Sequence, residues 1–128
     1  MTREEYTDFI DKYPELTTHG FGVDNKTYSK EKEHERLKDH FEAFQASCHM
    51  LENNFSTKPL RKHTYNSYSL KHAAEYYSEN VLKNRVYVPE GALVAAVLYL
   101  GLPHQRFKRK TCILVKLQNL NRENTNNI

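Results

Sequence analysis

Residues that can bind phosphate are concentrated in the second half of the chain. Lysine and arginine neutralise phosphates, and aromatic rings stack on bases. The basic residues in this half include Lys58, Arg61, Lys62, His63, Lys71, Lys83, Arg85, His104, Arg106, Lys108, Arg109 and Lys110, with Tyr65, Tyr68, Tyr76 and Phe107 interleaved among them. The pattern favours nucleic-acid binding as one interpretation. The alternative is a merely solvated rim, because charge clusters are common on loops.

The histidines do not follow a metal-binding pattern. His34 and His40 are the closest pair on one predicted helix, and six residues separate them. That spacing places them about 240° apart around a helix axis, too far apart to chelate one ion. The chain has no H-E-x-x-H sequence and no Cys/His spacing typical of zinc. We expect no metal and no cofactor.

The two cysteines, Cys48 and Cys112, lie far apart in the sequence. Cys48 falls on the apolar stripe of a predicted helix and Cys112 in a predicted strand, so both are interpreted as reduced core residues. The sequence contains no G-x-S-x-G and no glycine-rich phosphate loop. A cysteine and a histidine could still meet in space, but nothing in the sequence points to it. We expect a protein that is not an enzyme.

Charge divides the chain into two halves. Residues 1–54 hold 7 Lys and Arg against 12 Asp and Glu, whereas residues 55–116 hold 11 against 3. An acidic face and a basic face are therefore expected, and either one can attract a partner of opposite charge. The acidic face could imitate nucleic acid before a basic protein. The alternative is that the two halves attract each other across the fold.

No apolar run reaches the ~18 residues that a membrane span needs. The N-terminal sequence MTREEYTDFI is acidic where a signal peptide begins with basic and then apolar residues. We therefore predict a cytoplasmic protein with no membrane partner.

Two helices are predicted in the first half. A capping box at Thr2 and Glu5 begins a short helix that Pro14 ends, and a loop follows. Ser29 caps a long helix to about residue 52, whose charged first turns are expected to project into solvent or to contact a partner. A polar hinge follows, in which residues 61–65 are predicted as a short strand.

The second half alternates predicted helices and strands. Ser69 or Ser67 caps an amphipathic helix, and residues 85–88 are predicted as a strand. Residues 90–100 are predicted to form a central buried helix, because every residue from 92 to 100 is apolar, and Gly101 fits its C-terminal cap. Residues 111–117 are predicted as a strand that pairs near 85–88.

A stretch of about 40 residues in this half resembles small, largely uncharacterised proteins of phages, plasmids and related mobile elements. Their shared pattern is SYxLKH, a gap, and then YVxNG before an apolar helix. The matching residues are Ser67, Tyr68, Leu70, Lys71, His72, Glu75, Tyr87, Val88, Gly91, Ala95, Ala96 and Gly101. The chain departs from the pattern at Pro89–Glu90. The resemblance implies a mobile-element origin and assigns no catalytic residue.

A helix-turn-helix over residues 69–101 is excluded, because a recognition helix presents polar side chains to bases and ALVAAVLYL has none. We therefore expect a non-catalytic binding protein of a phage or mobile element. It would act by stoichiometric binding to a host or element protein that handles nucleic acid, as an anti-defence or anti-CRISPR inhibitor does. The alternative is direct, weakly sequence-specific DNA or RNA binding by the basic half. The candidate binding residues are Lys71, His72, Arg85, His104, Arg106, Lys108, Arg109 and Lys110.

The predicted fold is a single α+β domain over residues 1–117, with an acidic helical half (1–54) and a basic half (55–117). About four helices surround the central helix 90–100, beside a small sheet of two or three strands. Residues 118–128 are expected to form a polar, flexible tail.

Overall fold

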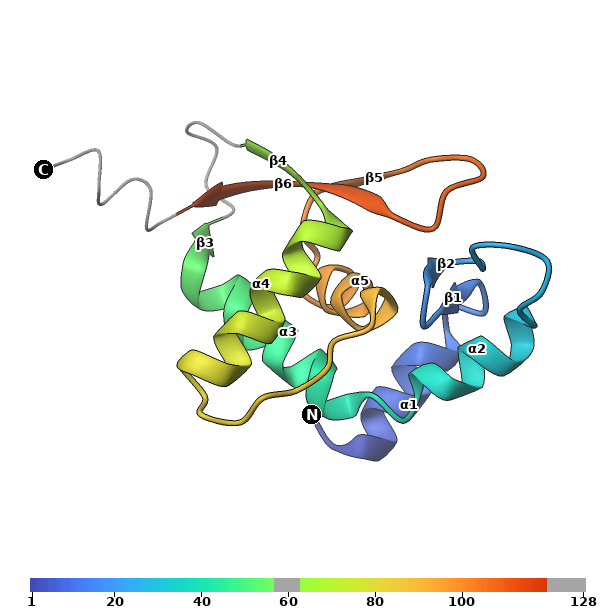
Figure 1. The fold of residues 1–128 in the computed structure, drawn as a ribbon, viewed down its shortest axis with the longest axis horizontal. Coiled ribbons are helices and arrows are strands. Elements are labelled where there is room, and N and C mark those ends of the chain that lie inside the picture. The colour runs from blue at the N-terminus through green and yellow to red at the C-terminus, as the bar shows by residue number, and fades with distance from the viewer. Residues whose placement is uncertain (57–62, 120–128) are drawn as a thin grey trace, which may run out of the picture.

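A buried helix, α5 (Glu90–Tyr99), runs through the middle of the fold (Figure 1). The computed structural model describes residues 1–56 and 63–119. The other elements, in chain order, are α1 (Arg3–Asp11), β1 (Leu16–Thr17), β2 (Gly20–Phe21), α2 (Lys30–Leu37), α3 (Phe41–Asn54), β3 (Phe55–Ser56), β4 (His63–Asn66), α4 (Ser67–Asn80), β5 (His104–Arg106) and β6 (Ile113–Asn119).

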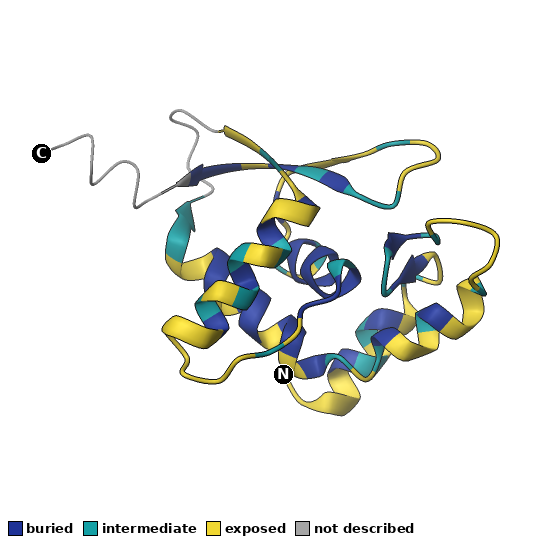
Figure 2. Ribbon diagram, viewed as in Figure 1, coloured by how far each residue is buried: buried dark blue, intermediate teal, exposed yellow. Residues whose placement is uncertain are grey.

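Helix α5 fulfils the role that its composition predicts. Residues 91–97 are buried, and α3 and α4 pack against them, so the helix appears almost wholly dark blue in Figure 2. At its C-terminus Gly101 has a φ of 66° and its N–H donates to Leu98, while the Leu102 N–H donates to Val97. These two hydrogen bonds form the Schellman motif, and they confirm the predicted end of the helix.

The larger sheet is built around β6. It pairs antiparallel with β4 along one side and with β5 along the other, and with β3 at its end near Asn119. In Figure 1 this sheet lies above α4 and α5. The predicted strand 111–117 is therefore confirmed with a shift of two residues. The prediction at 61–65 corresponds to β4, with residues 61 and 62 outside the described part.

Residues 85–88 do not form a strand, so that prediction and their pairing with 111–117 are wrong. They run as an extended segment that leads into α5 and buries Val88 completely. Both sides of β6 are already occupied by β4 and β5, so no position beside β6 is left for this segment. Its β-branched and aromatic composition reflects packing rather than strand pairing.

The predicted long helix 29–52 is in fact two helices, α2 and α3, with a break at residues 38–40. At the break the Leu37 carbonyl accepts hydrogen bonds from the Tyr6 hydroxyl (2.7 Å) and the His40 N–H (3.1 Å). The change of direction lets Phe41 and Phe44 pack against the Tyr6 ring. The break is thus fixed by a contact with α1.

The charged first turns of α2 are expected to project into solvent or to contact a partner, but not all of their side chains are exposed. Glu33 is only 6% exposed and accepts a hydrogen bond from the Thr18 hydroxyl at 2.5 Å. Thr18 directly follows β1, which pairs with β2 in a two-stranded hairpin where the sequence indicated only a loop. Strands of two residues are too short to produce a periodic signal.

The α+β class is confirmed: the described residues contain four helices besides the central α5, and two small antiparallel sheets rather than one. Asn66 caps α4, since its side chain accepts from the Ser69 N–H at 2.7 Å; neither predicted serine does so. Gln118 and Asn119 belong to β6 rather than to a tail, and residues 120–128 lie outside the described part. One core contains residues from both charge halves.

Candidate binding surfaces

The structure divides seven of the eight predicted binding residues between two surfaces. Lys71 and His72 lie on α4, whereas the other basic residues of the cluster lie on and beside the β5–β6 hairpin. Those residues are His104, Arg106, Lys108, Arg109 and Lys110. Arg85 is exposed in the extended segment between α4 and α5. The eight candidates therefore do not form one site.

The first surface, here called the tyrosine surface, consists of Tyr68, Lys71, His72 and Tyr87. The Lys71 ammonium lies 5.4 Å from the Tyr68 ring centre and 5.6 Å from that of Tyr87. Tyr68 also meets the His72 ring edge to face, at 4.7 Å between ring centres. Tyr68 is 57% exposed and Tyr87 64% exposed. Two large rings are thus presented to solvent around one cation.

Neighbouring side chains hold this surface in place. The His40 ring contacts Tyr87 at 6.2 Å between centres, and burial lowers the His40 pKa below its ordinary value. His72 Nδ1 lies 3.1 Å from the Glu75 carboxylate. Because the rings are already oriented, little side-chain freedom is lost when a partner binds.

The SYxLKH…YV pattern divides between surface and core. Leu70, Val88 and the alanines of α5 are buried, whereas Tyr68, Lys71, His72 and Tyr87 form the tyrosine surface. The apolar positions and the buried Ser67 therefore serve the fold. The four residues of the tyrosine surface lie where a partner can contact them.

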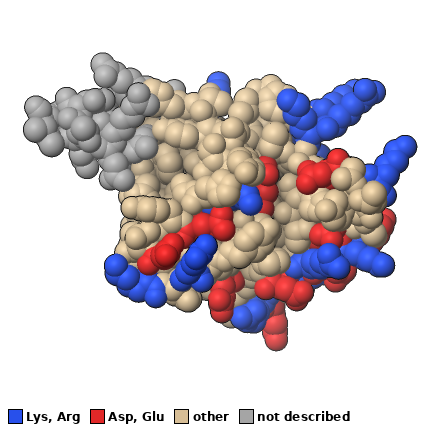
Figure 3. Space-filling model, viewed as in Figure 1, with Lys and Arg blue, Asp and Glu red and all other residues tan. Residues whose placement is uncertain are grey.

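The second surface is the basic ribbon, which comprises β5, the turn at residues 107–112 and the start of β6. The Phe107 carbonyl accepts from the Lys110 N–H at 3.4 Å, and Arg109 has a φ of 68°, so the chain reverses tightly. Lys108, Arg109 and Lys110 are exposed at the tip. Figure 3 shows Lys and Arg side chains projecting from the upper right, where Figure 1 places this turn.

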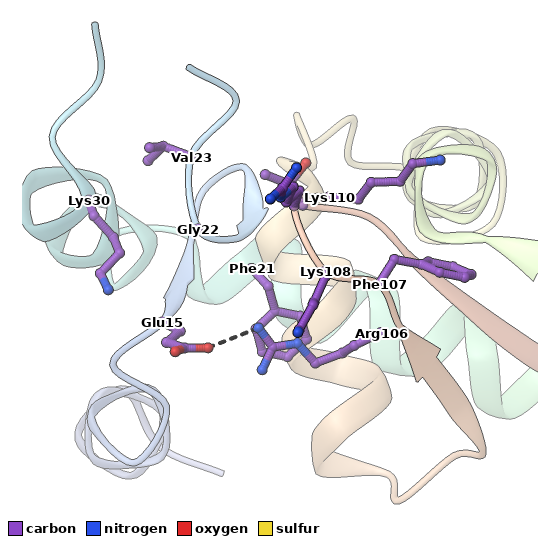
Figure 4. Close-up of a pocket in the computed structure, with 11 residues that line it drawn as sticks. Glu15, Phe21, Gly22, Val23, Lys30, Arg106, Phe107, Lys108 and Lys110 are labelled. Carbon is purple, nitrogen blue, oxygen red and sulfur yellow. Dashed lines mark hydrogen bonds and ion pairs between the residues drawn. The ribbon is translucent and has the colours of Figure 1, made fainter. Parts of the chain in front are cut away.

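A cleft of about 390 Å³ is lined by residues of the basic ribbon, of β2 and of α2 (Figure 4). Arg106 crosses it: the guanidinium lies 3.8 Å from the centre of the Phe21 ring and 2.8 Å from a Glu15 oxygen. Arg106 holds the pKa of Glu15 below its usual value. Lys30 lies across the cleft from the ribbon. Arg106 thus anchors the ribbon, while the tip residues remain exposed.

His104 is tied to its own loop, because Nδ1 lies 2.8 Å from the Leu102 carbonyl oxygen, which acts as the acceptor. The predicted role in binding therefore has weaker support for His104 than for the tip residues. Arg106 likewise has structural partners within the described residues. The sequence shows the basic cluster but not which of its members are already engaged.

Sequence reasoning missed one polar contact, between Ser67 and Glu90. The Ser67 hydroxyl is fully buried, accepts from the Ile113 N–H at 3.0 Å and lies 2.5 Å from the Glu90 carboxylate, to which it donates. Burial is the main reason why the Glu90 pKa is raised. Ser67 joins α4, α5 and β6, and its burial makes it a structural bridge rather than an accessible nucleophile.

One group of possible metal ligands occurs in the described residues, formed by Asp11, His34 and Glu35. The Lys38 ammonium lies 2.6 Å from Asp11 and 3.0 Å from Glu35, so a cation from the chain itself already neutralises these carboxylates. The His34 Nδ1 lies 2.6 Å from the Leu16 carbonyl. The arrangement is an ion-pair network between α1 and α2.

Cys48 does not resemble a reactive thiol, since burial raises its pKa to about 12. Both cysteines are free, and Cys48 lies in the core. A nucleophilic cysteine needs a thiolate and an accessible position, and Cys48 has neither.

Comparison with protein families, with curated proteins and with solved structures found no match to this chain. Among the residues that the structure describes, no helix is long and apolar enough to span a membrane. The two surfaces themselves are therefore the basis for a functional proposal.

Proposed function

We propose that this chain is a non-catalytic binding protein that associates one to one with another protein through its tyrosine surface. The observation that supports this most strongly is the placement of Lys71 between the exposed rings of Tyr68 and Tyr87. Tyrosine is among the residues enriched at the centres of protein interfaces, since it combines a large apolar face with a polar tip.

The composition around these rings favours a protein over a nucleic-acid strand. A strand-binding groove needs a track of cations along the backbone. On α4 the described residues offer instead one lysine, a histidine next to Glu75, and Glu79 one turn further on. Tyr76, which is 70% exposed on the same helix, and Val81 and Leu82, which follow the helix, are further exposed apolar side chains.

We further propose that the partner handles nucleic acid and that the chain inhibits it, as an anti-defence protein of a phage or mobile element does. The resemblance of the SYxLKH…YV stretch to mobile-element proteins supports this class of partner. So does the uneven charge of the sequence, with 7 Lys and Arg against 12 Asp and Glu in residues 1–54 and 11 against 3 in residues 55–116, because proteins that handle nucleic acid are themselves strongly charged.

The test is affinity capture from a bacterial lysate with the wild-type chain and with Tyr68→Ala/Tyr87→Ala. Truncation of a central interface tyrosine costs about 2 kcal/mol, which is roughly thirty-fold in affinity. The double variant should therefore lose the captured protein. Tyr28→Ala is the matched control, since Tyr28 is 45% exposed on a different element and contacts His19.

The captured protein must meet two further criteria. Mass spectrometry should identify it as one that binds or cleaves nucleic acid, and its activity should fall to a minimum at one equivalent of the chain. Equal capture by the double variant would refute the role of the tyrosine surface. A captured protein with no nucleic-acid activity would refute the proposed class of partner.

A further inference from the structure

The cleft beside the basic ribbon is lined by cations that form no ion pair within the described fold. Lys108, Arg109, Lys110 and, across the cleft, Lys30 have no carboxylate within 4.0 Å among the residues the structure describes. Arg106, by contrast, is paired with Glu15. The cleft lining thus contains five cationic residues and one carboxylate, and that carboxylate is already neutralised.

The ribbon is also held rigidly at its base. The Phe21 N–H donates to the Thr111 carbonyl at 2.9 Å, and the Thr111 hydroxyl donates to Asp24 at 3.1 Å. A β-carbon on Gly20 would lie 2.2 Å from the Thr111 oxygen, so β2 approaches the ribbon as closely as only glycine allows. The tip cations are therefore presented from a fixed support, which lowers the entropy cost of binding.

We infer that the basic ribbon binds the phosphate backbone of duplex nucleic acid. The pairing of β4 with β6 ends at Leu114, so beyond that residue the β5–β6 hairpin is two-stranded. A two-stranded antiparallel ribbon is one of the two elements that the major groove of B-DNA admits. Three consecutive cations at its tip would reach the phosphates on either side of the groove. This binding is independent of the tyrosine surface and does not depend on the function proposed above.

A duplex fits the tip better than a single strand does. Single-strand sites rely on exposed rings on which bases stack. The aromatic residue at the tip, Phe107, is half-buried, and the Lys110 ammonium lies 5.8 Å from its ring centre. Phe21 is buried beneath Arg106. The described surface of the ribbon therefore offers charge without a stacking platform.

The inference predicts binding with little sequence preference and strong salt dependence. Neutralising about three phosphates gives a slope of log K against log salt near −2.7, or about forty-fold weaker binding between about 50 and about 200 mM salt. The measurement is fluorescence anisotropy of a labelled duplex of about 20 base pairs, a length of roughly two helical turns. Single strands of the same sequence and heparin serve as competitors.

The test variant is Lys108→Gln/Arg109→Gln/Lys110→Gln, which removes the three charges and keeps polar side chains at the tip. Its control, Lys12→Gln/Lys32→Gln/Lys83→Gln, removes the same charge from exposed positions on other elements. Circular dichroism verifies that both variants fold. The ribbon variant should lose the salt-dependent binding and the control should keep it. Each single ribbon substitution should reduce the slope by about 0.9.

Several results would overturn the inference. One is no detectable duplex binding by the wild type at low salt. Another is an equal loss of duplex binding in the two triple variants, which would show that the binding depends only on the net charge of the protein. Unchanged affinity and slope in the ribbon variant would place the binding elsewhere. Tighter binding of single strands or heparin than of the duplex would contradict the assignment to duplex nucleic acid.

Discussion

Gly91 on α5 lies so close to Thr17 on β1 that a β-carbon at residue 91 would stand 1.7 Å from the Thr17 carbonyl oxygen. The Gly91 N–H also donates to the Thr18 carbonyl at 3.1 Å. The central helix therefore begins directly against the backbone of the β1–β2 hairpin. This contact joins the acidic half of the sequence to the basic half.

Gly91→Ala should destabilise the protein by about 3 kcal/mol or more, because the clash is with backbone atoms that cannot rotate away. The measurement is chemical denaturation followed by circular dichroism. Gly101→Ala is the control: a β-carbon there meets no atom within 4 Å, so only the strain of its positive φ is added, about 1–2 kcal/mol. A smaller loss in Gly91→Ala than in Gly101→Ala would contradict the packing described here.

The sequence predicts α5 well because its signals are local. The apolar run, Gly101 and Leu102 all act within a few residues of the helix, and each does in the structure what its type suggests. The break between α2 and α3 has no such signal, since the Tyr6 hydroxyl that contacts Leu37 is 31 residues away. Periodicity within one segment cannot reveal a contact of that separation.

The candidate surfaces likewise combine residues that the sequence identifies with contacts between distant residues that it does not reveal. Lys71 and His72 were identifiable from type and position, but Tyr87 joins them only because the segment after α4 folds back. Arg106 was predicted among the binding residues, and its partner Glu15 lies 91 positions earlier. Sequence alone therefore finds the cations without showing which of them are already paired.

Lys83→Gly should stabilise the protein slightly. Lys83 is exposed and has a φ of 59°, a conformation that costs a residue with a β-carbon about 1–2 kcal/mol. Glycine removes that strain but gives the unfolded chain more freedom, which offsets about 0.4–1 kcal/mol. We expect a net gain of about 0.5 kcal/mol in thermal denaturation. Lys83→Ala, which keeps the strain, should give none; an equal gain there would contradict the explanation.

Thr18→Val should destabilise the protein at neutral pH by about 1.5–3 kcal/mol, the value of a hydrogen bond to a charged group. The Thr18 hydroxyl is the main reason why the Glu33 pKa is lowered, with Arg36 and His19 adding to the effect. A lowered folded pKa stabilises the protein above the unfolded value of 4.5, and this stabilisation is lost as the pH falls through the folded pKa. The difference between variant and wild type should therefore shrink in acid.

The control for Thr18→Val is Thr7→Val on α1, which should change stability little at any pH. The measurement is the free energy of unfolding in urea across the acidic range. A destabilisation by Thr18→Val that stays constant as the pH falls below the folded pKa of Glu33 would show that the loss comes from packing alone.

Arg106→Lys should loosen the base of the basic ribbon while keeping the net charge. The Arg106 guanidinium is planar, so it stacks on the Phe21 ring and pairs with Glu15 at the same time. The lysine ammonium is not planar and cannot do both. We expect the Phe21 amide, which bonds to Thr111, to exchange its hydrogen several-fold faster. The Leu102 amide at the end of α5 serves as the internal reference. Equal acceleration at both amides would indicate global destabilisation instead.

Glu90→Gln should raise stability at neutral pH and have little effect in acid. Burial raises the folded pKa of Glu90 and Asp24 adds to that rise, whereas Ser67, Lys71 and His19 oppose it. The folded protein thus holds the Glu90 proton more tightly than the unfolded chain does. Stability is therefore lost as the pH rises through the folded pKa, and below the unfolded value of 4.5 no penalty remains.

The glutamine amide oxygen can still accept from the Ser67 hydroxyl, so the bridge between α4, α5 and β6 is kept. Thermal melting at about pH 7 and about pH 3.5 should show a higher midpoint for the variant only at the higher pH, where the wild-type carboxylate is charged. Glu79→Gln on the exposed side of α4 should show no such pH dependence. A lower midpoint for Glu90→Gln at neutral pH would contradict the prediction. It would show that the attraction of the Glu90 carboxylate to Lys71 and His19 outweighs the cost of burying its charge.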